Sequence, residues 1–103
     1  YDYHKFWDAA PALMHPKWDL YKYKEVCDTY SEKEIKKICK GNPYKWSVQN
    51  ANNILKTATY WERGDEFTKL SKEQRQKIDE TLHEQLAFAG YRLASVLNKI
   101  FSK

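Results

Sequence analysis

The clearest pattern of apolar and polar positions lies in the last third of the chain. Apolar residues recur there three or four positions apart, at Ile78, Leu82, Leu86, Leu93, Val96, Leu97 and Ile100. This is the spacing of one face of an α-helix. Ser71, followed three residues later by Gln74, forms a capping box that marks a helix start. The pattern predicts one long amphipathic helix from about Lys72 to Ile100.

A strip of small residues, Ala87, Gly90 and Ala94, runs along this predicted helix. A glycine inside a helix costs about 1 kcal/mol relative to alanine, so its presence favours close packing against a neighbouring helix. On this interpretation a leucine at Gly90 would overpack the contact and destabilise the fold.

Two shorter helices are predicted in the middle of the chain. Pro43 suits a first helical position and begins a segment to about Tyr60. The apolar stripe of that segment is formed by Trp46, Ala51, Ile54, Leu55 and Ala58. Ser31 and Glu34 form another capping box, which predicts a short helix ending near Lys40.

The first thirty residues give weaker signals. Residues 3–14 have apolar side chains at helical spacing but contain Pro11, which predicts a short helix or turn with an interruption. Residues 15–30 alternate tyrosine and lysine around Pro16 and are predicted to be a long irregular connection. The chain has no useful run of strand-like alternation and no internal repeat. We therefore predict an all-α fold, with residues 1–103 in a single domain.

Composition narrows the functional classes. The chain is 42% hydrophobic and 31% charged, with three glycines and three prolines, which excludes collagen-like and disordered proteins. The net charge of +4 favours an anionic partner, although lysines mixed with acidic residues are typical of solvated helix faces. No apolar run approaches the roughly 20 residues of a membrane-spanning helix, so we expect no membrane span.

Candidate chemistry begins with His4 and Asp8. Four residues apart on a helix, they share one face and offer the nitrogen and oxygen donors that suit zinc. The same spacing is also typical of a surface ion pair or a cap. His15 precedes a proline and His83 lies among glutamates, so both are expected to be surface residues rather than ligands.

The two cysteines, Cys27 and Cys39, leave two possibilities open. Their spacing fits either a local disulfide in an oxidising compartment or two free buried thiols. Two cysteines are too few for a zinc–cysteine module.

Three segments together resemble the S1/P1 nuclease family. His4-Lys5-Phe6-Trp7-Asp8 is similar to its His-x-x-Trp-Asp motif. The stretch from Gln85 to Asn98, with its Ala-Gly-x-Arg-Leu-Ala run, resembles the family's last helix. Between them Trp46-Ser47-Val48-Gln49-Asn50 is similar to a Trp-x-x-Glu-Ser element, from which Gln49 and Asn50 depart. The resemblance covers nearly the whole chain but only the last part of such an enzyme.

The resemblance implies the all-α, C-terminal part of a phospholipase C/nuclease-like zinc enzyme, its upstream part missing from residues 1–103. His4 and Asp8 would be two ligands in a three-zinc cluster. The implied reaction is hydrolysis of phosphodiesters in single-stranded DNA or RNA and of 3'-nucleotides, which would be the substrates. The chain identifies no general base and no base-stacking residue.

Because at most two ligands of one zinc are expected on this chain, it should be inactive without the upstream part, supplied on the same chain or as a separate one. The family also implies secretion into an oxidising compartment, and on that ground a bond between Cys27 and Cys39 is predicted. The alternatives are a phospholipase C-like zinc enzyme and a non-catalytic helical module in which His4 and Asp8 are ordinary surface residues. The closing Ala-Gly-x-Arg-Leu-Ala run favours the nuclease over the phospholipase.

Overall fold

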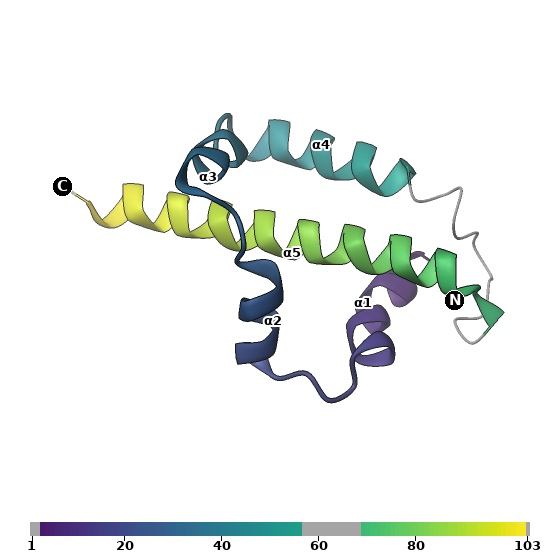
Figure 1. Cartoon of the computed structure of the whole chain (residues 1–103). Helices are drawn as coiled ribbons and strands as arrows, with labels where there is room; N and C mark the ends of the chain where they lie inside the picture. The colour runs from purple at the N-terminus through teal and green to yellow at the C-terminus, as the bar shows by residue number, and fades with distance from the viewer. Residues whose placement is uncertain (1–2, 57–68, 103) are drawn as a thin grey trace.

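The structure is a computed structural model that describes residues 3–56 and 69–102, with side chains from residue 8 onward. These ranges contain five α-helices, four shorter ones arranged around a long one. The helices are α1 (Tyr3–Met14), α2 (Leu20–Cys27), α3 (Glu32–Ile38), α4 (Pro43–Lys56) and α5 (Lys72–Phe101). No strand occurs in these ranges, and the all-α prediction is confirmed. Each of the four shorter helices packs against α5. Figure 1 shows α1 and α2 along one side of α5 and α3 and α4 along the other.

The long helix α5 begins where its capping box predicts. The Ser71 hydroxyl accepts a hydrogen bond from the backbone N–H of Gln74 at 3.1 Å, and the Gln74 side chain accepts one from the Ser71 N–H at 2.7 Å. Ser31 and Glu34 repeat this arrangement at the start of α3. Both predictions hold because a capping box satisfies free backbone donors within one turn of helix.

The core lies along the N-terminal half of α5. Its buried apolar residues are Ala10, Leu70, Ile78, Leu82 and Ala87. The second half of the predicted apolar stripe is not buried by the described residues, and Leu93, for example, is 60% exposed.

The small-residue strip on α5 does not form the predicted helix contact. Ala87 is buried, but Gly90 and Ala94 are exposed. A Cβ atom placed on Gly90 would meet nothing within 4 Å among the described residues outside its own helix. The expectation that leucine at this position overpacks a contact is therefore wrong for this part of the molecule.

The predicted irregular connection contains a helix, α2. Asp19 caps it, because its carboxylate accepts a hydrogen bond from the Lys22 N–H at 2.9 Å. Tyr23, Val26 and Cys27 are half-buried at helical spacing. The alternation of tyrosine and lysine concealed this period, and the prediction failed for that reason.

Proline residues act differently in α1 and α4. The sequence suggested an interruption at Pro11. This residue instead lies inside α1, and the helix continues past it to Met14. Pro43 begins α4 as predicted, and Asn42 accepts a hydrogen bond from the Lys45 N–H at 3.0 Å. The predicted end of this helix, near Tyr60, lies outside the described residues.

A buried arginine, Arg92, joins α3, α4 and α5. It is only 6% exposed, and its Nε donates to the Ile38 carbonyl at 3.0 Å. Its two Nη atoms donate to the side-chain oxygens of Asn50, at 3.3 Å, and of Gln49. The guanidinium also lies over the Trp46 ring, 5.3 Å from its centroid. One side chain thus fixes the relative positions of three helices.

The predicted disulfide is not formed in the structure. Cys27 ends α2 and Cys39 is the C-cap of α3, and both thiols are free. Burial, and after it the charge of Asp79, raises the pKa of the Cys27 thiol.

Candidate metal centre

The helix α1 carries the two zinc ligands predicted from the sequence. His4 and Asp8 both lie within Tyr3–Met14, one helical turn apart. The helix therefore places both positions on one face, as binding of a single ion requires. Asp8 is exposed, and the side chain of His4 lies outside the described residues. Their coordination of zinc therefore stays a prediction.

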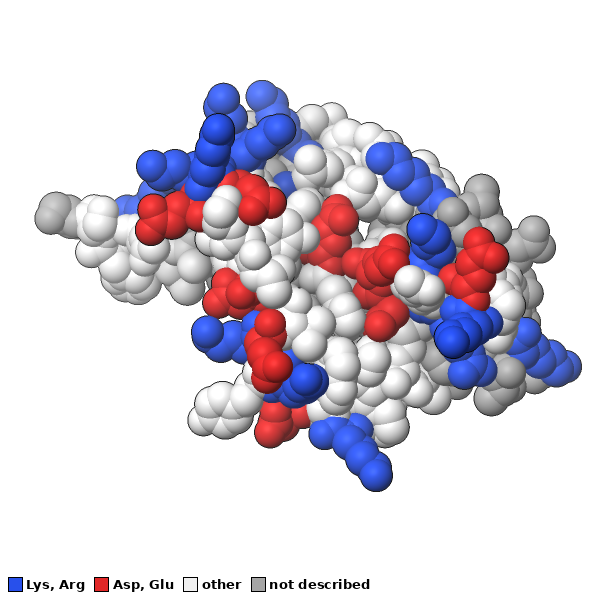
Figure 2. All heavy atoms as spheres, in the orientation of Figure 1, with Lys and Arg blue, Asp and Glu red and all other residues white. Residues whose placement is uncertain are grey.

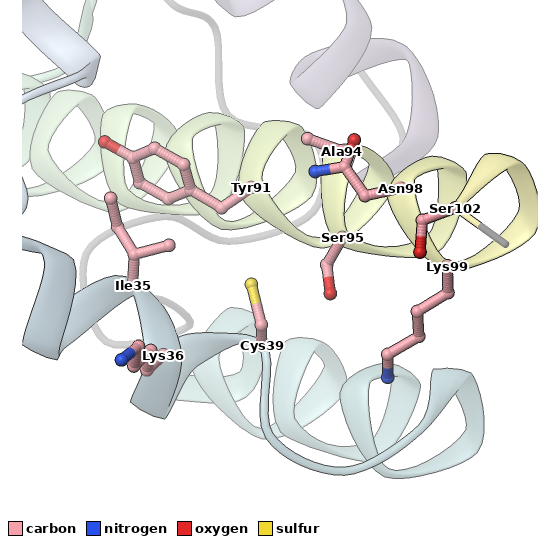
Figure 3. A pocket seen from close by; sticks show the side chains of 9 residues that line it. All are labelled: Ile35, Lys36, Cys39, Tyr91, Ala94, Ser95, Asn98, Lys99 and Ser102. Carbon is pink, nitrogen blue, oxygen red and sulfur yellow. The ribbon is translucent and has the colours of Figure 1, made fainter.

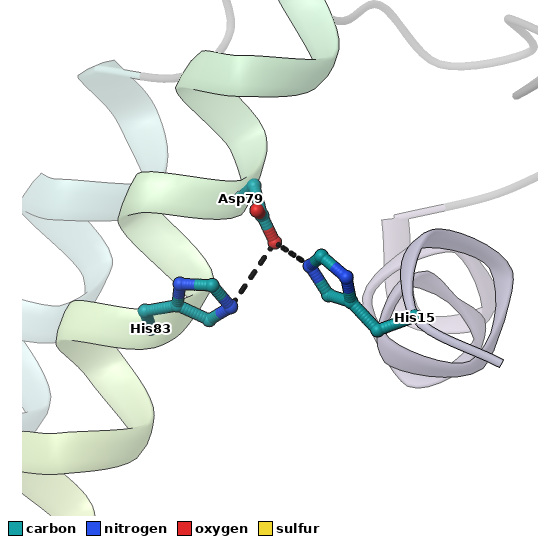
Figure 4. Close-up of side chains that lie close together, drawn as sticks. All are labelled: His15, Asp79 and His83. Atoms are coloured by element: carbon teal, nitrogen blue, oxygen red, sulfur yellow. Dashed lines mark hydrogen bonds and ion pairs between the residues drawn. The ribbon is translucent and has the colours of Figure 1, made fainter. Parts of the chain in front are cut away.

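The structure brings together a second group that the sequence did not suggest. His15, at the end of α1, and Asp79 and His83, both on α5, converge at one point (Figure 4). The His15 Nε2 and the Asp79 Oδ1 are 2.8 Å apart, and the His83 Nε2 lies 3.2 Å from the same oxygen. One ligand atom from each residue lies within 4.8 Å of the others. We call these three residues the His15–Asp79–His83 triad.

An aromatic ring covers one side of this triad. The Trp18 indole stacks on the His15 imidazole, with centroids 3.5 Å apart and an angle of 9° between the rings, and it also stacks on His83 at 5.5 Å. Tyr23 meets the edge of Trp18, and its hydroxyl donates to the Pro11 carbonyl at 3.1 Å. Burial, followed by the charge of Asp79, raises the pKa of Tyr23. Helices α1, α2 and α5 therefore all contribute to the surroundings of Asp79.

The prediction that both histidines are surface residues is wrong. Their side chains are 20% exposed for His15 and 18% for His83. The Nε2 atom of His83 is itself buried, yet no group in the described part of the chain makes a well-aligned hydrogen bond to it. Asp79 and His83 have the four-residue spacing of His4 and Asp8, which was the one signal in the sequence. These three residues are a second group of possible metal ligands, beside His4 and Asp8.

An open pocket of about 380 Å³ adjoins the triad. His15 and Asp79 form part of its wall, and Lys72 and Arg75 bring basic groups to it. The triad can therefore be reached from solvent.

A groove of similar volume lies between α3 and the end of α5 (Figure 3). Its wall includes the Cys39 thiol and the Lys36 and Lys99 amines but neither histidine nor carboxylate. It offers no set of zinc ligands, and α1 does not line it.

Charge on the face shown in Figure 2 is mixed, with lysines gathered over the α3 end and acidic groups close beside them. α3 itself contributes three lysines and two glutamates. This face carries no continuous basic surface of the kind that binds nucleic-acid backbones. None of the described helices is long and apolar enough to cross a membrane.

Comparison with known proteins identifies the family. No curated protein and no solved structure matches the chain. The family model described as S1/P1 Nuclease, however, matches residues 1–102, which is nearly the full length. Proteins of this family are zinc-dependent nucleases with a phospholipase C/P1 nuclease-like fold, in agreement with the all-helical structure. The chain belongs to the S1/P1 nuclease family.

Proposed function

We propose that this chain supplies part of the zinc site of an enzyme that hydrolyses phosphodiester bonds in single-stranded DNA or RNA and also 3'-nucleotides. The observation that carries the proposal is the family match over residues 1–102. It is supported by the placement of His4 and Asp8 one turn apart on α1. The same match favours a nuclease over a phospholipase C-like enzyme and over a non-catalytic helical module.

The donor chemistry of these two residues fits zinc. A neutral imidazole and a carboxylate are both common zinc ligands, and the α1 backbone directs them to one side of the helix. A catalytic zinc needs about three protein ligands and an open position. Two residues of α1 cannot complete such a site, so we propose that further ligands come from outside these 103 residues.

In the proposed mechanism the chain acts by positioning. Zinc, when bound, supplies Lewis-acid chemistry toward a phosphoryl group and the attacking water. His4 and Asp8 would hold the ion at a fixed place on α1, and the packing of α1 against α5 would fix that place relative to the rest of the fold. Both reactions would depend on the same two side chains. Secretion of the protein stays a prediction.

The test replaces each ligand in the full-length protein. His4→Ala and Asp8→Ala should each lower the zinc bound per chain and abolish most hydrolysis of single-stranded nucleic acid and of 3'-nucleotides together. Glu25→Gln serves as the control, because it removes one exposed carboxylate of α2 whose ion pair to Lys22 is long, at 3.5 Å. Full zinc content and full activity after His4→Ala would refute the proposal.

A further inference from the structure

We propose that the His15–Asp79–His83 triad binds a zinc ion of its own, separate from the ion held by His4 and Asp8, and that this ion ties the end of α1 to α5. The proposal rests on side-chain geometry and not on the proposed nuclease function. It would stand if that function were wrong.

The ligand types and distances suit zinc. Two imidazoles and one carboxylate are a common set for a zinc with an open fourth position. Ligand atoms bound at about 2.0–2.1 Å to a tetrahedral zinc lie roughly 3.3–3.4 Å from one another. The observed separations of 2.8 and 3.2 Å from Asp79 Oδ1, with all three atoms within 4.8 Å, are close to that arrangement. The two histidine nitrogens lie at most 4.8 Å apart, and rotation of the imidazole side chains would bring them to the tetrahedral separation when the ion binds.

The triad is incomplete as a purely hydrogen-bonded group. Asp79 Oδ1 faces the Nε2 atoms of both histidines, but only the contact from His15 is a well-formed hydrogen bond. The His83 Nε2 is buried, points at the same oxygen and has no aligned hydrogen-bond partner among the described residues. Buried nitrogens are rarely left in this state. A cation between the three atoms would use the lone pairs of both imidazoles and the charge of the carboxylate.

The surrounding structure holds the ligands in place. Asp79 and His83 are one turn apart on the well-packed helix α5. The Trp18 ring, stacked at 3.5 Å, limits rotation of the His15 imidazole. The pocket beside His15 and Asp79 gives an ion an entry path and leaves the fourth position to water.

This site is distinct from the family's zinc cluster. His15 follows Asp8 by seven residues, which corresponds to roughly 10 Å along a helix axis. Metal ions that share one reaction lie about 3.5–4 Å apart. The ion at the triad would therefore have a structural effect: it would join segments 64 residues apart in the chain and stabilise the helix that carries His4 and Asp8.

The first experiment measures zinc per chain in the full-length protein by elemental analysis. Asp79→Asn and His83→Gln should each lower the zinc content by about one ion per chain. Each should also abolish the rise in melting temperature that added zinc causes in the unmodified protein. Glu80→Gln is the matched control, because it neutralises the neighbouring, exposed carboxylate of α5. Equal zinc content in all three variants would overturn the proposal and leave the triad as a hydrogen-bonded contact.

A second measurement uses the unmodified protein, in case a triad variant does not fold. The imidazole nitrogens of His15 and His83 are assigned by NMR, and zinc is added to protein first stripped with a chelator. The Nε2 signals of both residues should move together to the range of metal-bound nitrogen. Signals that stay unchanged at saturating zinc would refute the site, while a loss of activity in the His4 and Asp8 variants would bear only on the proposed function.

Discussion

Replacing Arg92 with methionine tests the contact that joins α3, α4 and α5. Methionine keeps an unbranched stem of similar shape but has no hydrogen-bond donor. The change leaves the Ile38 carbonyl and the side-chain oxygens of Asn50 and Gln49 without their partner. It also removes a buried guanidinium whose pKa is lowered by desolvation. The net change in the free energy of unfolding is the stabilisation lost with the hydrogen bonds minus the desolvation energy that is no longer spent on the guanidinium.

Hydrogen bonds to a charged group are each worth about 1.5–3 kcal/mol. The amides of Gln49 and Asn50 lie on exposed positions of α4 and can turn to water, so their loss is partly offset. The Ile38 carbonyl cannot turn independently of the backbone. Breaking a fully buried ion pair costs about 3–5 kcal/mol, which gives an upper bound. We expect Arg92→Met to lower the free energy of unfolding by about 2–4 kcal/mol.

The assay is urea unfolding of the full-length protein, followed by helical circular dichroism and by tryptophan fluorescence. Trp46 lies beside the guanidinium, so its emission should report the change directly. Lys77→Met is the control: it removes an exposed cation of α5 whose pairing with Glu80 is long, at 3.9 Å, and it should change stability by less than about 0.5 kcal/mol. An Arg92→Met protein as stable as this control would show that the buried guanidinium does not join the helices.

The remaining predictions concern α5. Tyr91→Phe removes the 2.6 Å hydrogen bond that is the first cause of the lowered pKa of Asp28, so NMR should show that pKa rising toward 3.8, and an unchanged pKa would contradict the contact. Burial, and then this hydrogen bond, raises the pKa of Tyr91 to about 12, above its ordinary value of 10. The stability that the protonated Tyr91 contributes should therefore be complete below pH 10 and lost as the pH rises toward 12. Gly90→Ala should raise the free energy of unfolding by up to about 1 kcal/mol, since nothing faces this position among the described residues; a lower melting temperature would restore the idea of a tight helix contact.

The elements predictable from the sequence are those specified by local chemistry. The capping boxes at Ser31 and Ser71 need only residues three positions apart, and both helix starts were predicted for that reason. The helix α2 was missed although its cap, Asp19, is equally local, because a proline upstream and alternating tyrosines suggested a loop. Local signals therefore place helix ends well only when the apolar period beside them can also be recognised.

Packing could not be predicted to the same extent. The apolar period of α5 shows which side chains share a face, but not which neighbours cover that face. Ile78 is fully buried, whereas Leu93 on the same stripe is largely exposed. Gly90 was assigned a contact on the same reasoning and has none among the described residues. Periodicity determines the direction of a side chain, and only the tertiary arrangement determines its burial.

The triad shows why a second group of possible metal ligands was not found from the sequence. His15 and Asp79 are 64 residues apart, and their approach depends on how the end of α1 meets α5. Asp79 and His83 alone have a spacing that is as common in surface ion pairs as in metal sites. The assignment of His4 and Asp8 as zinc ligands was supported by a family motif, whereas His15 belongs to no motif that we recognised.

The departures from the family pattern at Gln49 and Asn50 can be explained by what these residues contact. The resemblance rested partly on a Trp-x-x-Glu-Ser element and partly on the closing run that contains Arg92. In the structure these two segments meet, because Arg92 donates to the side-chain oxygens of Gln49 and Asn50 and lies over Trp46. An amide oxygen can accept the hydrogen bond that a glutamate or serine oxygen would accept at the same position. Gln49 lacks the charge of the motif's glutamate but still offers an acceptor, so this chain makes the contact between α4 and α5 without that charge.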